Sequence, residues 1–241
     1  MEAGSKPLNA AAVRAQLEAL ADPRRAAWTA PYLGVVPGGY GEGDVLLGIP
    51  VPAQRRVARA TRDLPLDEVA ALLASPVHEH RFTALVILVG RHRRSRDPSE
   101  RAELSRFFLE HRAGVDNWDL VDASAPDLLG GELVDGDRAI LDELAGSASL
   151  WDRRIAVVAT WALIRRGEPG PTLALAERLL DDPHHLIHKA VGWMLREVGK
   201  RDEAVLVGFV EAHRSGMPRT MLRYAIERLS PEQRARLMAR D

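Results

Sequence analysis

Apolar residues recur along this chain at helical spacing, in blocks that begin in the same way. Each block opens with an acidic or polar residue, continues with a polar or basic residue, and ends in an apolar run. Such blocks start near residues 77, 115, 150 and 186, and a related one starts near residue 221. Because residues three or four positions apart share one face of a helix, each block predicts a helix with a buried apolar side.

The blocks form an internal repeat. When they are aligned, one position holds, in chain order, Arg81, Trp118, Arg154, Lys189 and Arg223. These residues are 37, 36, 35 and 34 positions apart, a repeat length typical of helix-pair solenoids such as HEAT and armadillo arrays. No useful run of alternating polar and apolar residues predicts a strand. We therefore predict an all-α fold, an α-solenoid of about six HEAT-like helix pairs with one concave face.

The segments between the aligned helices complete this prediction. Further helices are expected over residues 97–112, 135–145 and 170–180. Proline and glycine mark turns at residues 75–76, 167–171 and 182–183. The glycine-rich segment 34–43 predicts a flexible loop, and residues 1–9 are expected to be disordered. The remainder, residues 10–241, is expected to form a single domain.

Charge is balanced over the whole chain, with 33 Lys and Arg against 34 Asp and Glu. The net charge of -1 gives no general support for nucleic-acid binding. The aligned row is nevertheless basic, with one aromatic member, and such a row on the concave face of a solenoid would suit a DNA backbone. The alternative is that polar residues simply begin each inner helix and that cations stand there by chance.

The chain contains no cysteine, which excludes disulfides, thiolate metal sites and cysteine nucleophiles. It shows no charged-then-apolar leader and no apolar run near the ~20 residues that a membrane span needs. We expect a soluble, monomeric protein of the cytoplasm that does not bind a membrane.

Two segments carry the most informative chemistry. Trp118 and Asp122 are four residues apart, so a helix would point an aromatic ring and a carboxylate at the same place. Trp193 lies in a second helical stretch, between Lys189 and Arg196. Aromatic faces and a carboxylate beside basic residues suit a cationic base and its sugar. The alternative is that both tryptophans pack in the core and that the acid is a helix cap or a surface residue.

Other aromatic and titratable residues are weaker candidates. Trp28 and Trp161 are expected in the core. His184 and His188 share a helical face but lack the glutamate of a zinc-protease helix, so we expect no metal and no other cofactor.

A basic helix is expected to begin near Ala53 and to carry Arg55 and Arg56. The N–H groups at its start could face a phosphate, although a solvated surface helix is an equal alternative. No serine has the glycine-flanked setting of a hydrolase nucleophile, and no P-loop is present.

Four ordered stretches of the chain resemble the AlkD-type DNA alkylation repair glycosylases. They are Leu47-Gly48-Ile49-Pro50 with the following Arg55-Arg56, then residues 118–122, 151–156 and 189–197. The resemblance runs from about Leu47 to about Leu229, and residues 189–197 are its most specific part. Asn117 and Leu222 depart from the family pattern, because relatives often carry an aromatic residue and a basic residue there.

The resemblance implies a HEAT-like solenoid that grips duplex DNA containing alkylated bases in its concave face. It implies hydrolysis of the N-glycosidic bond of positively charged N3- or N7-alkylpurines, without flipping of the base into a pocket. The family's catalytic residues fall on Trp118, Asp122 and Trp193. With the family's DNA-contacting arginine and the basic residues described above, the predicted DNA-binding residues are Arg55, Arg56, Arg81, Arg154, Lys189, Arg196 and Arg223.

These expectations leave the lesion open. Small methyl adducts and bulky adducts of DNA-alkylating natural products would both reach an open site, so the role could be general repair or self-resistance. The enzyme would associate with the nucleoid when bound to DNA. The alternative function is a non-catalytic HEAT-type scaffold that binds DNA or a protein, and retention of Trp118, Asp122 and Trp193 argues against it.

Overall fold

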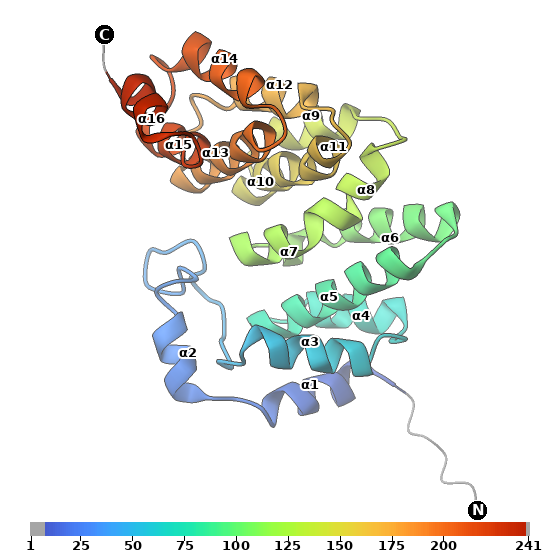
Figure 1. Ribbon diagram of the computed structural model, residues 1–241. Coiled ribbons are helices and arrows are strands. Elements are labelled where there is room, and N and C mark those ends of the chain that lie inside the picture. Colours follow the sequence, from blue (N-terminus) through green and yellow to red (C-terminus); the bar gives the residue numbers. More distant parts are fainter. Residues whose placement is uncertain (1–7, 240–241) are drawn as a thin grey trace, which may run out of the picture. The chain divides into compact units, whose positions relative to one another are not determined.

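The computed structural model describes residues 8–239 and confirms the all-α prediction (Figure 1). Within these residues, extended pairing is limited to one isolated parallel bridge between Val45 and Val77. The chain divides into two compact units, residues 1–124 and 125–241, and the boundary falls inside helix α7 (Trp118–Leu128). The single domain expected over residues 10–241 stays a prediction.

The first unit is built around helix α5 (His78–Arg94), whose long apolar run packs against four other helices. These helices are α1 (Ala10–Glu18), α3 (Val51–Ala60), α4 (Leu66–Leu73) and α6 (Pro98–Glu110). Phe82, Leu85 and Leu88 of α5 are buried, and full burial of such side chains stabilises a fold by roughly 1.5–3 kcal/mol each. The first four residues of α5 are also buried although they are polar or charged, and they belong to the candidate site.

Helix α2 (Pro23–Thr29) differs from the other helices of the first unit because none of its residues is buried. It stands beside the stacked α1, α3 and α5 in Figure 1, followed by the glycine-rich loop. The short 3₁₀ turn η1 (Arg112–Gly114) leads into α7. The N-terminal residues 1–7, part of the segment predicted to be disordered, lie outside the described residues. Asn9 caps α1 by accepting a hydrogen bond of 2.9 Å from the Ala12 N–H.

The second unit is built around helix α13 (His185–Gly199). The helices that pack against it are α10 (Leu150–Ala159), α11 (Trp161–Arg165), α12 (Gly170–Arg178), α14 (Glu203–His213) and α15 (Arg219–Ala225). The remaining helices are α8 (Gly130–Leu133), α9 (Ala139–Ala145) and α16 (Pro231–Met238). Gly192 lets α13 approach α15 closely, because a Cβ atom there would lie 2.5 Å from the Met221 carbonyl oxygen.

The helices predicted from the repeat are confirmed. The aligned residues all lie in the first two turns of a helix: Arg81 in α5, Trp118 in α7, Arg154 in α10, Lys189 in α13 and Arg223 in α15. The helices predicted between them correspond to α6, α9 and α12. The exposure of the aligned side chains varies, however, from buried arginines to the exposed Arg223. The winding of the helix pairs into a solenoid with a concave face stays a prediction.

The glycine-rich segment is a loop with its own hydrogen bonds rather than an open chain. The Gly41 N–H donates to the Gly34 carbonyl at 3.0 Å, and the Tyr40 hydroxyl donates to the Tyr32 carbonyl at 3.1 Å. Gly34 has a φ of 69°, and a Cβ atom there would lie 2.6 Å from the ring of Tyr40. The aromatic ring therefore closes over a glycine that no other residue could replace without strain.

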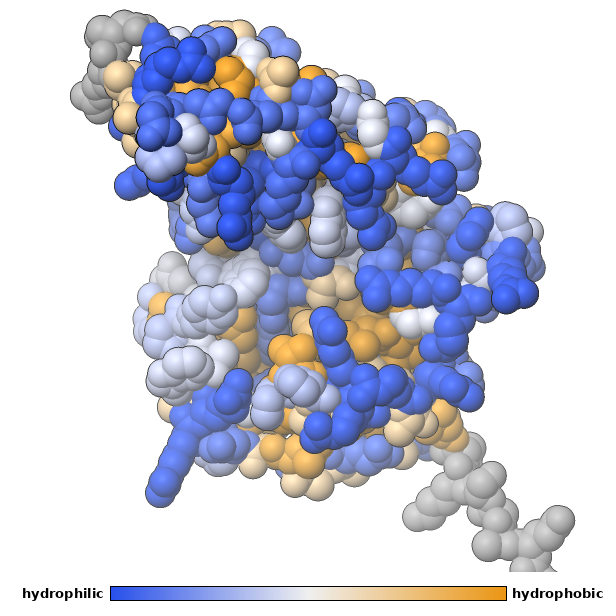
Figure 2. All heavy atoms as spheres, in the orientation of Figure 1, coloured by the Kyte–Doolittle hydropathy of each residue, from blue (hydrophilic) through white to orange (hydrophobic). Residues whose placement is uncertain are grey.

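Figure 2 shows a mixed surface on this face of the molecule, where long hydrophilic side chains cross apolar patches. Within residues 8–239, no helix combines the length and the apolar character that crossing a membrane requires.

Candidate active site

An open cleft of about 500 Å³ lies in the first unit, and residues of α2, α3, α5 and α7 line it. Its polar and aromatic lining residues are Arg25, Trp28, Thr29, Tyr32, Gln54, Arg55, His78, Glu79, Phe82, Trp118, Asp119 and Asp122. We call it the aromatic cleft. Two of the three residues predicted to be catalytic, Trp118 and Asp122, thus line one hollow, as their four-residue spacing on a helix requires.

Trp28, Tyr32 and Trp118, with the buried Phe82, give the cleft its aromatic character. The rings of Tyr32 and Trp118 meet edge to face, with centroids 5.2 Å apart and an interplanar angle of 88°. Trp28 also lines the cleft and is 76% exposed, so the prediction that Trp28 packs in the core is wrong. Helix α2 buries no side chain, which leaves this ring in solvent. Trp28 and Tyr32 are four positions apart in the sequence, and this spacing was the signal that could have placed both rings at one site.

The buried carboxylate of Glu79 holds one wall of the cleft together. It accepts hydrogen bonds from the N–H groups of Leu47, Gly48 and Ile49, at 2.9, 2.7 and 3.3 Å. Gly48 has a φ of 77°, and a Cβ atom there would lie 2.2 Å from the Asp22 carbonyl oxygen. The Leu47-Gly48-Ile49-Pro50 stretch therefore joins the start of α2 to α5, and sequence reasoning missed Glu79 as its partner.

Asn117 positions the start of α7 relative to the glycine-rich loop. Its fully buried side chain donates from Nδ2 to the Leu33 carbonyl at 2.9 Å, and its Oδ1 accepts from the Trp118 N–H at 2.8 Å. A buried amide with both ends bonded fixes the orientation of the backbone on each side. The residue that departs from the family pattern thus links Trp118 to the segment that carries Tyr32.

A network of charged side chains includes His78 and Asp119 of the cleft wall. His78 bonds through Nε2 to Asp119 at 2.9 Å and lies 3.4 Å through Nδ1 from Asp44. Arg81 donates to both oxygens of Asp44, at 2.7 and 2.8 Å, and lies 3.0 Å from Asp116. Buried charges are tolerated where each has an opposite charge within bonding distance.

The network keeps His78 positively charged at neutral pH. Burial alone would lower its pKa, but the hydrogen bonds to Asp119 and Asp44 outweigh burial and raise the pKa to about 9. Burial opposes ionisation of Asp44 as well, yet its bonds to His78 and Arg81 hold the pKa of this carboxyl below its usual value. Asp119 is therefore bound to a cation, and Asp122, one turn along α7, is a second carboxylate on the cleft wall.

The predicted DNA-binding residues of the first unit have different surroundings. Arg55 lines the aromatic cleft, and Arg56 beside it is exposed. Arg81 is 3% exposed and pairs with Asp44, so the structure gives it a role in the buried network. Its contact with DNA stays a prediction, and its burial argues against that contact.

In the second unit, Trp193 is half-buried on α13. Its ring centroid lies 5.9 Å from that of Trp161, and its Nε1 donates to Glu197 at 3.1 Å. Trp161 was expected in the core, but it is half-buried and the guanidinium of Arg165 lies over its ring, 5.4 Å from the centroid. Trp193 therefore belongs to a second aromatic site, which lies in the second unit and includes the carboxylate of Glu197.

The basic residues of the second unit also differ in exposure. Arg154 is 4% exposed and donates to the Leu186 carbonyl at 2.7 Å, so its predicted phosphate contact conflicts with its burial. Arg196 forms an ion pair with Glu227, and Lys189 is half-buried. Arg223 is exposed and bonds weakly to the Arg219 carbonyl at 3.4 Å.

The histidines considered for metal binding have other partners. His188 bonds through Nε2 to the Asp182 carbonyl at 2.5 Å, and the rings of His184 and His185 stack. In the described part of the chain, no group of three or more His, Asp or Glu side chains could hold a metal ion.

Two comparisons with known proteins indicate the same family. A family model described as "DNA alkylation repair enzyme" matches residues 13–229. A solved structure described as a predicted DNA alkylation repair enzyme from Enterococcus faecalis is similar in fold, with a TM-score of 0.68 and 18% sequence identity. The similarity covers 88% of this chain and 97% of that one. No curated protein matches the sequence.

Proposed function

This chain belongs to the family of DNA alkylation repair enzymes, and from that premise we propose that it is a monofunctional DNA glycosylase. Its substrates are duplex DNA bases that carry a positive charge after alkylation at N3 or N7 of a purine. It acts on the nucleoid as a monomer, without a metal or another cofactor. The observation that carries this proposal is a carboxylate, Asp122, on the wall of an open aromatic cleft that also contains Trp118.

The chemistry needs little from the protein because the lesion is already a good leaving group. The bond between C1′ and the purine nitrogen breaks, its electron pair neutralises the cationic base, and positive charge develops on the deoxyribose. A water molecule adds to C1′ and loses a proton. The Asp122 carboxylate stabilises the sugar cation and orients the water, which requires an ionised group close to C1′. A non-catalytic scaffold would have no use for such a carboxylate among aromatic rings.

The aromatic rings recognise charge. Trp118 meets Tyr32 edge to face, an arrangement that fixes the plane of the Trp118 ring. A cationic nucleotide is attracted to such a π face, and Trp193 supplies a second ring for the same purpose. Trp28 and Tyr32 are 76% and 68% exposed, which supports a cleft that meets the lesion on the surface of the duplex rather than enclosing a flipped base.

The proposal is tested by incubating the protein with methylated duplex DNA and scoring both released bases and abasic sites. We expect release of N3- and N7-methylpurines above the spontaneous rate, with one abasic site formed per released base. The matched control is Asp181→Asn, an exposed acid outside both aromatic sites, which should behave as wild type. Release at the spontaneous rate, from a protein that still binds the duplex, would contradict the glycosylase assignment.

A further inference from the structure

His78 lies between two parts of the chain that shape the aromatic cleft. It is the first residue of α5, it lines the cleft and it is 3% exposed. Its Nε2 bonds to Asp119 of α7 at 2.9 Å, and its Nδ1 lies 3.4 Å from Asp44, which follows the glycine-rich loop. A neutral imidazole carries one N–H donor, so both carboxylates can be bonded only when each ring nitrogen holds a proton.

The backbone fixes His78 beside the end of that loop. The Val45 N–H donates to the Pro76 carbonyl at 3.0 Å, and the His78 N–H donates to the Val45 carbonyl at 3.0 Å. Asp44 directly precedes this bridge, so its carboxylate is delivered to the His78 ring. His78 is therefore anchored to the loop by its backbone as well as by its side chain.

Asp119 depends on His78 for its hydrogen bond. Its Oδ2 is bonded to His78, while its Oδ1, among the described residues, is buried without a hydrogen-bond partner. Asp119 directly follows Trp118 and lies three residues before Asp122, so all three belong to the beginning of α7. The bond to His78 therefore ties the turn that carries the ring and the carboxylate to α5.

Two other contacts hold the beginning of α7, and neither depends on pH at alkaline values. The Asn117 amide bonds to the Leu33 carbonyl, and Arg81 lies 3.0 Å from Asp116. An amide does not titrate, and a guanidinium stays charged.

Two carboxylates and one guanidinium act most directly on the proton of His78. Asp119 and Asp44 lie at its two ring nitrogens, and Arg81, one turn along α5, opposes its positive charge. Burial lowers the pKa of His78, but the two carboxylates outweigh burial and raise it to about 9. A rise in pH past that value removes one proton from a ring that has two partners.

The other helices packed against α5 carry charges with partners of their own. Arg14 of α1 donates to a backbone carbonyl at 2.6 Å, and Glu68 of α4 accepts from a backbone N–H at 2.8 Å. Glu100 of α6 accepts from a hydroxyl at the C-terminal end of α5 at 2.5 Å. The remaining charged residues of the cleft lining are Glu79, Asp122, Arg25 and Arg55.

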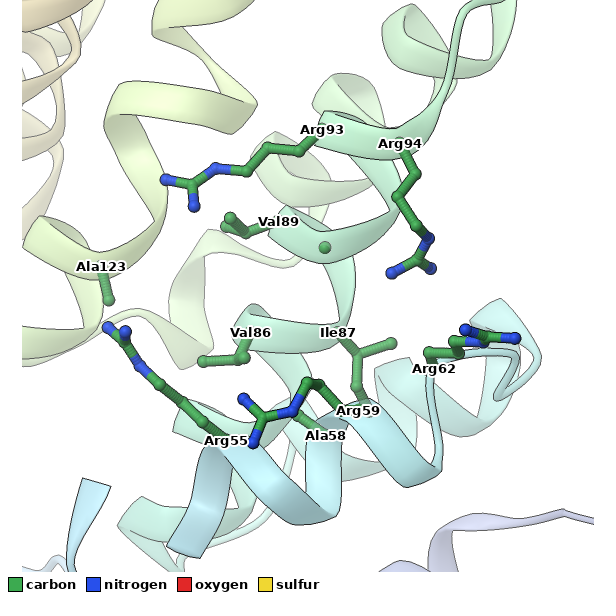
Figure 3. Close-up of a pocket in the computed structure, with 11 residues that line it drawn as sticks. Arg55, Ala58, Arg59, Arg62, Val86, Ile87, Val89, Arg93, Arg94 and Ala123 are labelled. Carbon is green, nitrogen blue, oxygen red and sulfur yellow. The ribbon is translucent and has the colours of Figure 1, made fainter. Parts of the chain in front are cut away.

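Arg55 supplies a permanent cation on the α3 side. In Figure 3 its guanidinium extends from α3 toward Ala123, the residue that follows Asp122 on α7, and both residues line the aromatic cleft. This charge is present at any working pH. A change in pH near 9 therefore leaves the Arg55 cation in place and alters the attachment of α7 through His78.

We propose that His78 is a positioning residue of the aromatic cleft. With a proton on each ring nitrogen, it fixes the first turn of α7 through Asp119, and so holds the Trp118 ring and the Asp122 carboxylate in the arrangement that excises the base. This role rests on the proposed function. His78 acts through Asp119 rather than on the base, because both of its nitrogens are directed to carboxylates.

Loss of one proton breaks this arrangement. The neutral ring donates to one carboxylate and turns a lone pair toward the other. The first turn of α7 is then free to shift, and a misplacement of reacting groups by ~1 Å can slow a reaction ~100-fold.

The first test follows the cleft without DNA. The five tryptophans are replaced by 5-fluorotryptophan, and the fluorine resonance of Trp118 is identified by its absence in Trp118→Phe. In wild type this resonance should shift with a midpoint at about pH 9. The transition should be absent in His78→Gln. In Asp44→Asn it should move to lower pH, because one of the two carboxylates that raise the pKa of His78 is gone.

The second test is the pH profile of single-turnover release of 7-methylguanine, corrected for spontaneous release, with circular dichroism to verify folding at each pH. Wild-type excision should fall by as much as ~100-fold across the same midpoint. His78→Gln should be slow throughout and lack this fall, and Asp44→Asn should fall at lower pH. His111→Gln is the matched control and should keep the wild-type profile, since His111 is a half-buried histidine at the end of α6 that does not line the cleft.

A Trp118 resonance that shifts equally in wild type and His78→Gln, or not at all, would overturn the inference. So would excision profiles that coincide in wild type and Asp44→Asn, a comparison that still decides if His78→Gln does not fold. Because the fluorine measurement needs no substrate, the two proposals can fail separately. The expected shifts in a protein that releases no methylpurine would support the link from His78 to Trp118 and contradict the glycosylase assignment alone.

Discussion

The two tryptophans that the sequence placed on an equal footing have different surroundings. Trp118 lines an open cleft with three carboxylates and two exposed aromatic side chains. Trp193 is half-buried against Trp161, and its indole N–H is bonded to Glu197, which is itself paired with Lys200 at 2.6 Å. A tryptophan early in an amphipathic helix therefore does not define a site by itself. The open cleft wall beside Trp118, which carries Asp122, is what points to chemistry in the first unit.

The largest effect is expected from Asp122→Asn. If this carboxylate stabilises the sugar cation, neutralising it should slow excision by an amount equivalent to ~2.7–4 kcal/mol, as when one such group is removed from other enzymes. Binding to alkylated duplex should change little. The measurement is single-turnover release of 7-methylguanine, with Glu197→Gln as the counterpart in the second unit. An equal loss in the two variants would remove the distinction between the units.

Glu79→Gln should destabilise the first unit without touching the second. A glutamine offers one carbonyl oxygen where the carboxylate serves three backbone N–H groups, and each buried donor left unpaired costs about 1–3 kcal/mol. Hydrogen exchange, resolved by residue, should show faster exchange in residues 47–49 and in α2. Unchanged exchange there would show that the carboxylate does not hold the Leu47-Gly48-Ile49-Pro50 stretch.

The pH dependence of stability should be carried by the first unit through His78. Its pKa is raised to about 9 in the folded protein from an ordinary value of 6.5, so the protonated pair with Asp119 stabilises the fold fully below about pH 6.5. This stabilisation, on the order of 2 kcal/mol, declines between those two values and is lost above about pH 9. Urea unfolding of wild type and His78→Gln should converge as pH rises. Parallel curves up to pH 10 would contradict the ion pair.

Substitution of the rings should have the smallest effects. Trp118→Leu removes the π face but keeps an apolar side chain, and the loss of an exposed cation–π contact costs at least ~0.5–1 kcal/mol. Trp118→Phe should retain part of the excision rate. At position 193 we likewise expect the rate to fall from tryptophan to phenylalanine to leucine. In addition, Trp193→Leu loses the bond to Glu197 and should lower the stability of the second unit. Full activity with leucine at both positions would rule out recognition of charge by the rings.

Much of the fold could be predicted from the sequence because helices follow local patterns. The aligned repeat position correctly predicted where α5, α7, α10, α13 and α15 begin. This was possible because apolar periodicity and turn residues determine helices through neighbours a few positions apart. The division into two units could not be predicted in this way, because it depends on contacts between residues far apart in the chain.

Only part of the candidate site could be predicted from the sequence. The spacing of Trp118 and Asp122 revealed them, because a helix brings such residues to one face. Trp28 was missed because an aromatic side chain suggests a core position, yet no residue of α2 is buried. His78 and Glu79 were missed because their partners are more than 25 residues away. The repeat also pointed to buried arginines as DNA contacts, since a row of equivalent positions carries no information on exposure.

The most direct test of the account is whether the charge of the lesion decides its excision. Single-turnover release should be measured from duplexes of one sequence that carry 7-methylguanine, N3-methyladenine, uracil or hypoxanthine at the same position. We predict release of the two cationic bases and rates at background for the two neutral ones. Neutral bases are poor leaving groups, and both ring nitrogens of the protonated His78 on the cleft wall are directed to Asp119 and Asp44 rather than to a leaving base. Release of uracil or hypoxanthine at a rate comparable to that of the methylpurines would contradict the account.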